Sequence, residues 1–245
     1  MSRLVFWHGW GMAPEAWHPL LSALDMRFAG QFTAQTPALP GYMGTPLPGT
    51  DTCPAWVDTL MAPLSEPVVL CGWSMGAIMA LDAARRYPGK IRKLVLFGAT
   101  PCFINRHDWA NGLPEETAGK FREGVQTDSK TTLRRFIMLF NQHDQHAREI
   151  SRQLASLPYP SDEVLLKGLD FLHTVDFRTI VPEIQQPVLL VHGRNDPLMP
   201  VSAAEWLAKT LPDASLTVIP KAAHAPFLSV PGQCADIIGK FLRWS

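Results

Sequence analysis

The sequence has no excess of either charge, since Lys and Arg together number 22 and Asp and Glu also number 22. A net charge of zero removes the whole-molecule attraction that favours nucleic acid, so we expect no nucleic-acid partner. The sequence also lacks an apolar run of the roughly 18–20 residues that a membrane helix needs, and we expect no membrane association. The few residues before His8 leave no room for the core of a signal peptide.

Cysteine is scarce, with four residues in a chain of 245 and no pair at CxxC spacing. This scarcity argues against a disulfide framework or a cysteine zinc site, and favours reduced thiols in the cytoplasm. Charged residues make up only 18% of the chain and hydrophobic residues 47%, which excludes a disordered chain. We therefore expect a soluble, monomeric cytoplasmic protein with a sizeable core.

Short apolar runs alternate along the chain with helical patterns, which is typical of an α/β fold. Runs such as Val68-Val69-Leu70 do not alternate with polar residues, and this favours parallel strands that are buried on both faces. The pattern predicts a mostly parallel central sheet flanked by helices. The expected strands are 4–7, 32–36, 67–71, 91–97, 187–191 and 215–219, and the expected helices lie near 13–24, 54–64, 75–87, 202–211 and 232–243.

The alternation breaks between residues 101 and 186, where helical patterns occur without a convincing strand. Two of these helical patterns cover residues 131–141 and 147–157. The break predicts a helical cap at 101–186, inserted into a core made of residues 1–100 and 187–245. Such a cap would cover the strand ends at which open α/β sheets bind ligands.

The most specific motif is Gly72-Trp73-Ser74-Met75-Gly76, a G-x-S-x-G between a predicted strand and a predicted helix. This is the context of a nucleophile elbow, in which the glycines allow a sharp turn and the serine projects above the sheet. The helix N-terminus beneath the serine favours negative charge. Ser74 is therefore the candidate nucleophile, and the alternative is a glycine turn with a helix-capping serine.

A serine nucleophile needs a base and an orienting acid, which follow it in the order acid, histidine in this kind of fold. Asp196 lies just past the predicted strand 187–191, and His224 lies on the loop after 215–219. We take them as acid and base; the alternative is a turn aspartate and a surface histidine. Among the other histidines, His8 and His192 precede glycines at strand ends, where we expect them to brace loops.

An oxyanion hole needs two main-chain N–H donors beside the nucleophile. We expect them from Met75, which follows the serine, and from Trp10, on the loop after the first strand. We expect no metal and no cofactor. His143 and His146 with Asp144 are the only spacing that suggests a metal, and they lack an i, i+4 pair and a further ligand.

The candidate site residues, in the order Trp10, Ser74, Met75, Asp196 and His224, resemble those of the α/β-hydrolase superfamily. The resemblance covers nearly the whole chain. The chain also resembles a narrower family, the pimeloyl-[acyl-carrier protein] methyl ester esterases of biotin biosynthesis. Tryptophans in both the oxyanion loop and the elbow contribute to this resemblance. The segments that carry it are 8–11, 72–76, 100–103, 167–169 with 174–178, and 221–227.

The narrower resemblance implies the same triad and oxyanion residues, and it assigns two further groups. A cap segment that forms the acyl pocket would comprise Phe136, Ile137, Met138, Leu139 and Phe140. Arginines that hold the acyl carrier protein would be Arg135, Arg148 and Arg152. Thr131 stands where the family has another arginine, and the N-terminus is too short for the edge strands that usually precede the first strand.

Charge along the cap agrees with an acidic partner. Residues 130–152 hold five Lys or Arg against one Asp and one Glu, a net charge of +3 in a neutral chain. Arg148 and Arg152 form an i, i+4 pair on one helix face. The alternative reading is an ordinary solvated helix surface.

The sequence therefore predicts a serine carboxylesterase that acts on the methyl ester of a carrier-bound pimeloyl chain. The alternatives within the fold are a broad short-chain carboxylesterase and a C–C bond hydrolase. A dehalogenase or epoxide hydrolase would need an aspartate where this elbow has Ser74. A ligand receptor without turnover is the alternative from another class, and an intact triad argues against it.

Overall fold

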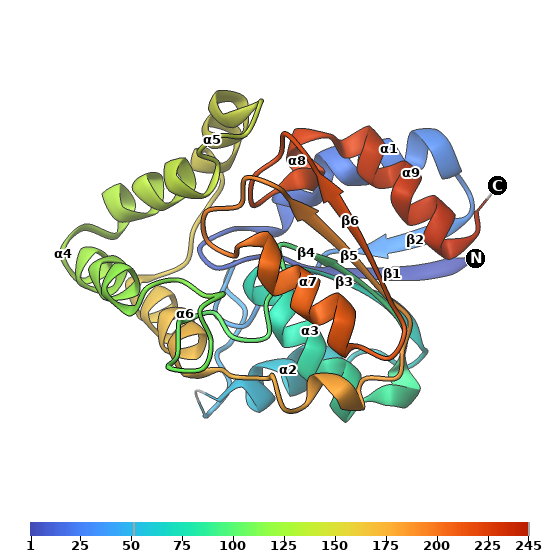
Figure 1. Cartoon of the computed structure of the whole chain (residues 1–245), viewed down its shortest axis with the longest axis horizontal. Helices are drawn as coiled ribbons and strands as arrows, with labels where there is room; N and C mark the ends of the chain where they lie inside the picture. The colour runs from blue at the N-terminus through green and yellow to red at the C-terminus, as the bar shows by residue number, and fades with distance from the viewer. Residues whose placement is uncertain (51, 245) are drawn as a thin grey trace.

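A computed structural model describes residues 1–50 and 52–244 (Figure 1). In this part of the chain six strands form one parallel sheet in the order β2-β1-β3-β4-β5-β6. The strands are β1 (Ser2–Trp7), β2 (Phe32–Gln35), β3 (Val68–Trp73), β4 (Ile91–Phe97), β5 (Val188–Gly193) and β6 (Ala214–Ile219). All six coincide with predicted strands, to within two residues at each end. The α/β prediction is therefore confirmed, and every strand pair in the described residues is parallel.

Helices cover both faces of this sheet. α1 (His18–Phe28) and α9 (Pro231–Leu242) lie together on one face. α2 (Cys53–Met61), α3 (Met75–Arg86) and α7 (Val201–Thr210) lie on the other face. β3 is buried at every residue because it is central and covered on both sides, as its unbroken apolar run predicts.

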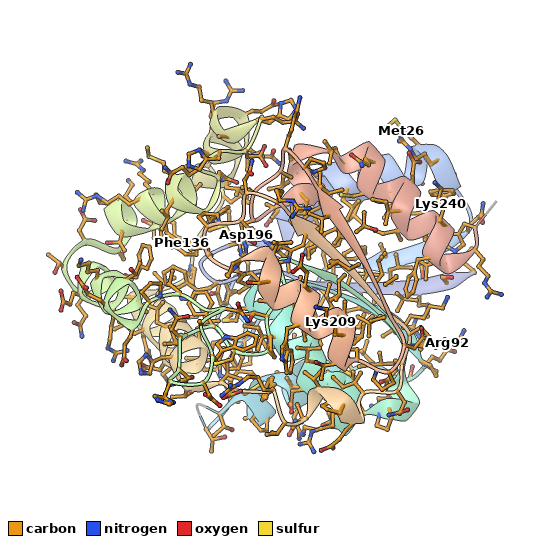
Figure 2. All side chains as sticks on the ribbon, in the orientation of Figure 1. Met26, Arg92, Phe136, Asp196, Lys209 and Lys240 are labelled. Atoms are coloured by element: carbon orange, nitrogen blue, oxygen red, sulfur yellow. The ribbon has the colours of Figure 1, made fainter. Side chains whose placement is uncertain are left out.

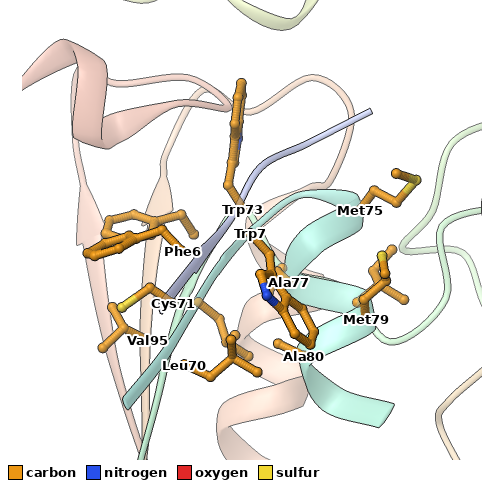
Figure 3. Close-up of a cluster of buried hydrophobic side chains, with 14 of the residues drawn as sticks. Phe6, Trp7, Leu70, Cys71, Trp73, Met75, Ala77, Met79, Ala80 and Val95 are labelled. Atoms are coloured by element: carbon orange, nitrogen blue, oxygen red, sulfur yellow. The ribbon is translucent and has the colours of Figure 1, made fainter. Parts of the chain in front are cut away.

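Alternate side chains of the central strands reach the two layers of the core. Figure 3 shows Trp7 beside α3, whereas Phe6, its neighbour on β1, lies on the opposite side of the strands. Both are fully buried. Phe6 contacts Trp17, which stacks on Phe227 with ring centroids 4.3 Å apart. The aromatic layer thus ties the start of the chain to α8 (Pro226–Ser229), directly after the loop of His224.

The segment between β4 and β5 carries α4 (Glu115–Phe140), α5 (Ala147–Ala155) and α6 (Asp162–Thr174). These helices gather at the C-terminal end of the sheet (Figure 1). α4 is two helices joined at Asp128, whose backbone is non-helical at φ −157° and ψ 87°. The Asp128 carboxylate accepts a hydrogen bond from the Thr131 N–H at 3.0 Å, and so caps the second half. The predicted helix at 131–141 therefore covers only the second half of α4, and the first half, from Glu115, was not predicted.

No helix among the described residues is long and apolar enough to span a membrane.

Candidate active site

Ser74 occupies the turn between β3 and α3 in a strained conformation, with φ 57° and ψ −120°. A Cβ on Gly72 would lie 2.6 Å from the Gly76 carbonyl oxygen, and one on Gly76 would lie 2.7 Å from the His8 carbonyl oxygen. Any side chain at either position would therefore force the backbone apart. The two glycines of the motif allow β3, α3 and the loop after β1 to meet at the serine. This geometry is that of a nucleophile elbow.

Asp196 lies on the loop after β5, and its side chain is held at both oxygens. Oδ1 accepts hydrogen bonds from the main-chain N–H groups of Leu198 and Met199, each at 2.9 Å. Oδ2 lies 2.7 Å from Nδ1 of His224. Burial acts to raise the pKa of the Asp196 carboxyl, but His224, with smaller contributions from His192 and the Met199 N–H, outweighs burial and lowers it. The Asp196 carboxylate is therefore held ionised beside the His224 ring.

His224 is buried, and its backbone is fixed on both sides. Its N–H donates to the carbonyl oxygen of Phe140 at 3.2 Å, and its carbonyl oxygen accepts from the Trp73 indole at 3.0 Å. With Nδ1 bonded to Asp196, the remaining ring nitrogen is Nε2, which has no hydrogen-bond partner in the described part of the chain. Nε2 is thus available to take a proton from a nucleophile, as a general base must.

Two further histidines brace loops near Ser74, Asp196 and His224, as their places in the sequence predict. His8 accepts the Leu39 N–H at Nε2 (3.2 Å), and its Nδ1 lies 2.9 Å from the Gly9 carbonyl oxygen. Burial lowers the pKa of His8 to about 4, so the ring is neutral. His192 bonds the Met199 carbonyl oxygen through Nε2 at 2.7 Å, and burial lowers its pKa as well. Both rings are committed to main-chain partners and compete poorly for the role of base.

The two residues expected to form the oxyanion hole lie next to the elbow. Met75 is the first residue of α3, and an N–H in the first turn has no acceptor within its own helix. A Cβ on Gly9, the residue before Trp10, would lie 3.2 Å from Cβ of Ser74. A Cβ on Gly168 of α6 would meet both Trp10 (2.5 Å from Cδ1) and Met75 (3.6 Å from Sδ). The structure therefore brings Trp10 and Met75 together beside Ser74, where both contact α6 at Gly168.

The cap segment expected to form the acyl pocket is divided by the helical period. Phe136, Ile137 and Phe140 are buried, whereas Met138 is 67% exposed and Leu139 is half-buried. The Phe136 ring lies 4.9 Å from the Trp10 ring, and Phe140 lies 5.6 Å from His224 (ring centroids). Figure 2 shows Phe136 on α4, and Asp196 where the sheet meets the cap helices. Met138 faces solvent because it lies on the opposite face of α4 from this aromatic group.

The three arginines expected to bind the carrier protein are exposed. Arg135 lies on α4, and Arg148 and Arg152 lie on α5. Within residues 1–50 and 52–244 none of the three forms an ion pair, although the charge of Arg135 acts on the nearby carboxylate of Asp128. Asp144, one of the two acids of this segment, is buried. The outer surface of residues 130–152 is therefore more positive than the sequence count alone indicates.

His143, His146 and Asp144 do not form a metal site. His143 and His146 are exposed, while both oxygens of Asp144 accept hydrogen bonds from the chain. Among the described residues no group of three or more His, Cys, Asp or Glu is placed so that it could hold a metal ion.

Two residues around the triad were missed by the sequence argument. The indole of Trp73 holds the backbone of His224, although the motif assigns no role to its second position. Gly98 follows β4 with φ +50°, and a Cβ there would lie 2.9 Å from two atoms of the His224 ring. A glycine directly after a predicted strand is the signal that could have pointed to Gly98.

Comparison with known proteins identifies relatives of the whole chain. A family model described as alpha/beta hydrolase family matches residues 4–237. A pimeloyl-[acyl-carrier protein] methyl ester esterase of Aromatoleum aromaticum is 42% identical over 249 residues, covering 98% of each chain. One of Nitrosomonas europaea is 35% identical, covering 96% of this chain and 94% of the relative.

Solved structures give the same fold at lower identity. An esterase from Exiguobacterium antarcticum superposes with a TM-score of 0.89 at 21% identity, covering 99% of this chain and 92% of that one. A bromoperoxidase from Bacillus anthracis has the same TM-score, identity and coverage. At this identity the likeness concerns the fold alone.

Proposed function

Because the chain belongs to the alpha/beta hydrolase family, we propose that it is a serine carboxylesterase of biotin biosynthesis. Its substrate is the methyl ester of pimeloyl-[acyl-carrier protein], and its products are methanol and pimeloyl-[acyl-carrier protein]. The substrate assignment draws on the printed names of the relatives, which are 42% and 35% identical over nearly the whole chain. The observation that carries the catalytic part is the 2.7 Å bond between Asp196 and His224, on the two loops beside the elbow of Ser74.

The reaction proceeds in two halves. His224 takes the proton from Ser74 as Oγ attacks the ester carbonyl, and Asp196 stabilises the imidazolium that forms. The N–H groups of Trp10 and Met75 donate to the oxyanion of the tetrahedral intermediate. His224 then protonates the departing methoxide, and methanol leaves an acyl-serine. Finally, His224 activates a water that releases the free carboxylate and restores Ser74.

The acyl chain of the substrate is also joined to the carrier protein by a thioester, and that thioester must survive the reaction. We assign the buried aromatic residues Phe136 and Phe140, with Ile137, to the pocket for the far end of the acyl chain. We place the entry of the acyl chain between α4 and α5, where a small hollow lies against both helices. Its lining extends from Lys130 and Arg134 to Gly11, the neighbour of Trp10. A chain that enters there would place its distal ester at Ser74 and leave the thioester near the surface.

The docking surface for the carrier is assigned to Arg135, Arg148 and Arg152. Their exposure and lack of ion pairs within the described chain suit an acidic partner, since charge-assisted contacts would form without breaking internal ones. Residues 101–186 act as the cap and residues 1–100 with 187–245 as the catalytic core. All three residues of the proposed triad belong to one chain, so the chemistry needs no second copy, and we propose a monomeric enzyme without a cofactor. We propose the cytoplasm as its compartment because all four cysteines are free thiols.

Methanol release tests this function. The assay compares pimeloyl-[acyl-carrier protein] methyl ester with the free dimethyl ester of pimelic acid, using wild type and Ser74→Ala. We expect a higher kcat/KM on the carrier-bound ester, methanol and carrier-bound carboxylate in equal amounts, and no activity of Ser74→Ala. Equal kcat/KM values on both esters would identify a broad carboxylesterase, and cleavage of the thioester would contradict the proposed orientation.

A further inference from the structure

The turn after α4 leads the chain from the cap back towards the loop that carries His224. Asp144 lies in this turn and is 7% exposed. Its Oδ2 accepts the main-chain N–H of Ala223 at 2.8 Å. Its Oδ1 accepts the Ser229 hydroxyl and the N–H of His146, each at 2.8 Å. One buried carboxylate therefore joins its own turn, the residue before His224, and α8.

Neighbouring bonds make this junction continuous. The Phe140 carbonyl oxygen accepts the N–H of His224, and the N–H of Gln145 donates to the Lys221 carbonyl oxygen at 3.0 Å. The Asn195 side chain, next to Asp196, donates to the His143 carbonyl oxygen at 2.8 Å. The turn thus contacts the loops of both the base and the acid. Within this junction, the side chain of Asp144 holds the loop of His224 by one hydrogen bond, from the Ala223 N–H.

The base loop is pressed against the sheet on its other side. A Cβ on Gly193 would lie 2.5 Å from the carbonyl oxygen of Ala222, and would also collide with that of Ala223. The loop therefore lies between Gly193, which limits its approach to β5, and Asp144, which holds it from the cap side. Hydrogen bonds to an ionised acceptor are about twice as strong as neutral ones, and suit a fixed position of this kind.

We propose that Asp144 is a positioning residue for His224: by holding the Ala223 N–H it fixes the loop of His224 in place beside the elbow of Ser74. The proposal rests on the proposed roles of Ser74 and His224. Asp144 does not touch the reacting atoms, and its effect passes through the imidazole. The alternative is a carboxylate that only stabilises the junction of cap and core.

A positioning role and a purely stabilising role of Asp144 predict different effects on kcat in an enzyme that lacks the His224 imidazole. Asp144→Ala removes all three hydrogen bonds. Asp144→Asn keeps the shape of the side chain and one acceptor oxygen, but its amide NH₂ group replaces the other oxygen. Because each oxygen of Asp144 accepts a main-chain N–H, one of these N–H groups then faces a donor instead of an acceptor. Each substitution is made in wild type and in His224→Ala. The assay is hydrolysis of p-nitrophenyl acetate, a small activated ester that needs no carrier and leaves residual turnover measurable without the base. Asp82→Asn is the matched control, because Asp82 is a buried aspartate on α3 that bonds Arg86 and no residue of the triad.

In the wild-type background we expect Asp144→Ala to lower kcat by at least about tenfold, with KM within about twofold. Asp144→Asn should lie between Asp144→Ala and wild type. In the His224→Ala background neither substitution should lower the residual rate further, because a residue that acts through the base has nothing left to position. Asp82→Asn should lower the melting temperature and leave kcat and KM unchanged.

Equal proportional losses in both backgrounds, or a kcat of Asp144→Ala within about twofold of wild type, would overturn the proposal. If Asp144→Ala does not fold, Asp144→Asn decides by the same comparison, with circular dichroism confirming the fold. The failure of the proposed function is separately visible, since His224→Ala would then be as active as wild type. Loss of activity in His224→Ala together with full activity in Asp144→Ala would refute the positioning role alone.

Discussion

Gly98 offers a sharp test of how closely the base is held. Its ideal Cβ would lie 2.9 Å from Cε1 and from Nδ1 of His224, and 3.0 Å from the His224 carbonyl oxygen. The backbone of Gly98 cannot retreat freely, because its N–H donates to Val191 of β5 at 3.2 Å. In Gly98→Ala the imidazole must therefore move, and with it the bond from Nδ1 to Asp196.

The size of the effect follows from these contacts. Ordinary van der Waals contact begins at 3.4 Å, so the ring must shift by about half an ångström. A displacement of about 1 Å at a catalytic group can cost about 100-fold in rate, and we expect kcat of Gly98→Ala to fall about 10-fold or more. The positive φ of +50° adds a stability cost of about 1–2 kcal/mol for any residue with a Cβ. For a chain of this size that cost corresponds to a melting temperature lower by about 2–8 °C.

The control is Gly30, which has φ +78° and nothing within 4 Å of an ideal Cβ. Gly30→Ala carries the same kind of backbone strain without the collision, so it should lower the melting temperature and leave kcat unchanged. The assay is steady-state hydrolysis of a small chromogenic ester alongside thermal unfolding of each variant. A kcat of Gly98→Ala within about twofold of wild type would refute the displacement of the His224 ring. So would a loss of activity in Gly30→Ala as large as that in Gly98→Ala.

Three further predictions concern the acid, the pH dependence of stability and the carrier surface. Asp196→Asn should lower kcat by about 10⁴-fold with little change in fold, because an amide favours the wrong tautomer of His224; steady-state kinetics and circular dichroism measure both. His8 has an ordinary pKa of 6.5 that falls to about 4 in the folded chain, so the unfolded chain binds the proton more readily. The free energy of unfolding should therefore decrease as pH falls from about 6.5 to about 4, by about 3 kcal/mol from this residue. Urea denaturation should show a smaller decrease in His8→Asn, and an identical decrease would contradict the assignment. Charge reversal of Arg135, Arg148 and Arg152 to Glu should lower kcat/KM at least about tenfold for the carrier-bound ester and leave a small free ester unaffected, whereas equal losses on both would indicate damage to the cap.

The sheet and the elbow could be predicted because their signals are local. The apolar runs 68–71 and 94–97 are buried parts of β3 and β4, and their lack of alternation is a direct consequence of burial on both faces. Gly72 and Gly76 are recognisable in the sequence because a sharp turn between strand and helix excludes a Cβ.

The residues that support the base could not be predicted, because they contact it across long stretches of sequence. Asp144 and Ala223 are 79 residues apart, and Trp73 and His224 are 151 apart. Neither pair has a motif that marks it, and Asp144 looked like a possible metal ligand beside two histidines. Only the return of the cap to the core shows that its carboxylate meets the loop of the base.

The cap shows the same limit within one helix. The sequence of residues 136–140 predicts a helix from local signals alone. Which side of that helix faces the core depends on how α4 packs against its neighbours. Met138 was therefore grouped with Phe136 and Phe140 by the family resemblance, although it lies outside the buried aromatic group. The break at Asp128, which sets the direction of the second half of α4, likewise depends on a cap bond to Thr131.

The proposed function depends above all on Ser74 as the nucleophile, activated by His224 and Asp196. Mass-spectrometric mapping of the adduct formed with a fluorophosphonate, which reacts preferentially with activated serines, identifies the nucleophile directly. We expect one adduct per chain, located on the peptide that contains Ser74, and loss of labelling in Ser74→Ala and in His224→Ala. An adduct on any other serine, or undiminished labelling of Ser74→Ala, would contradict this role of Ser74.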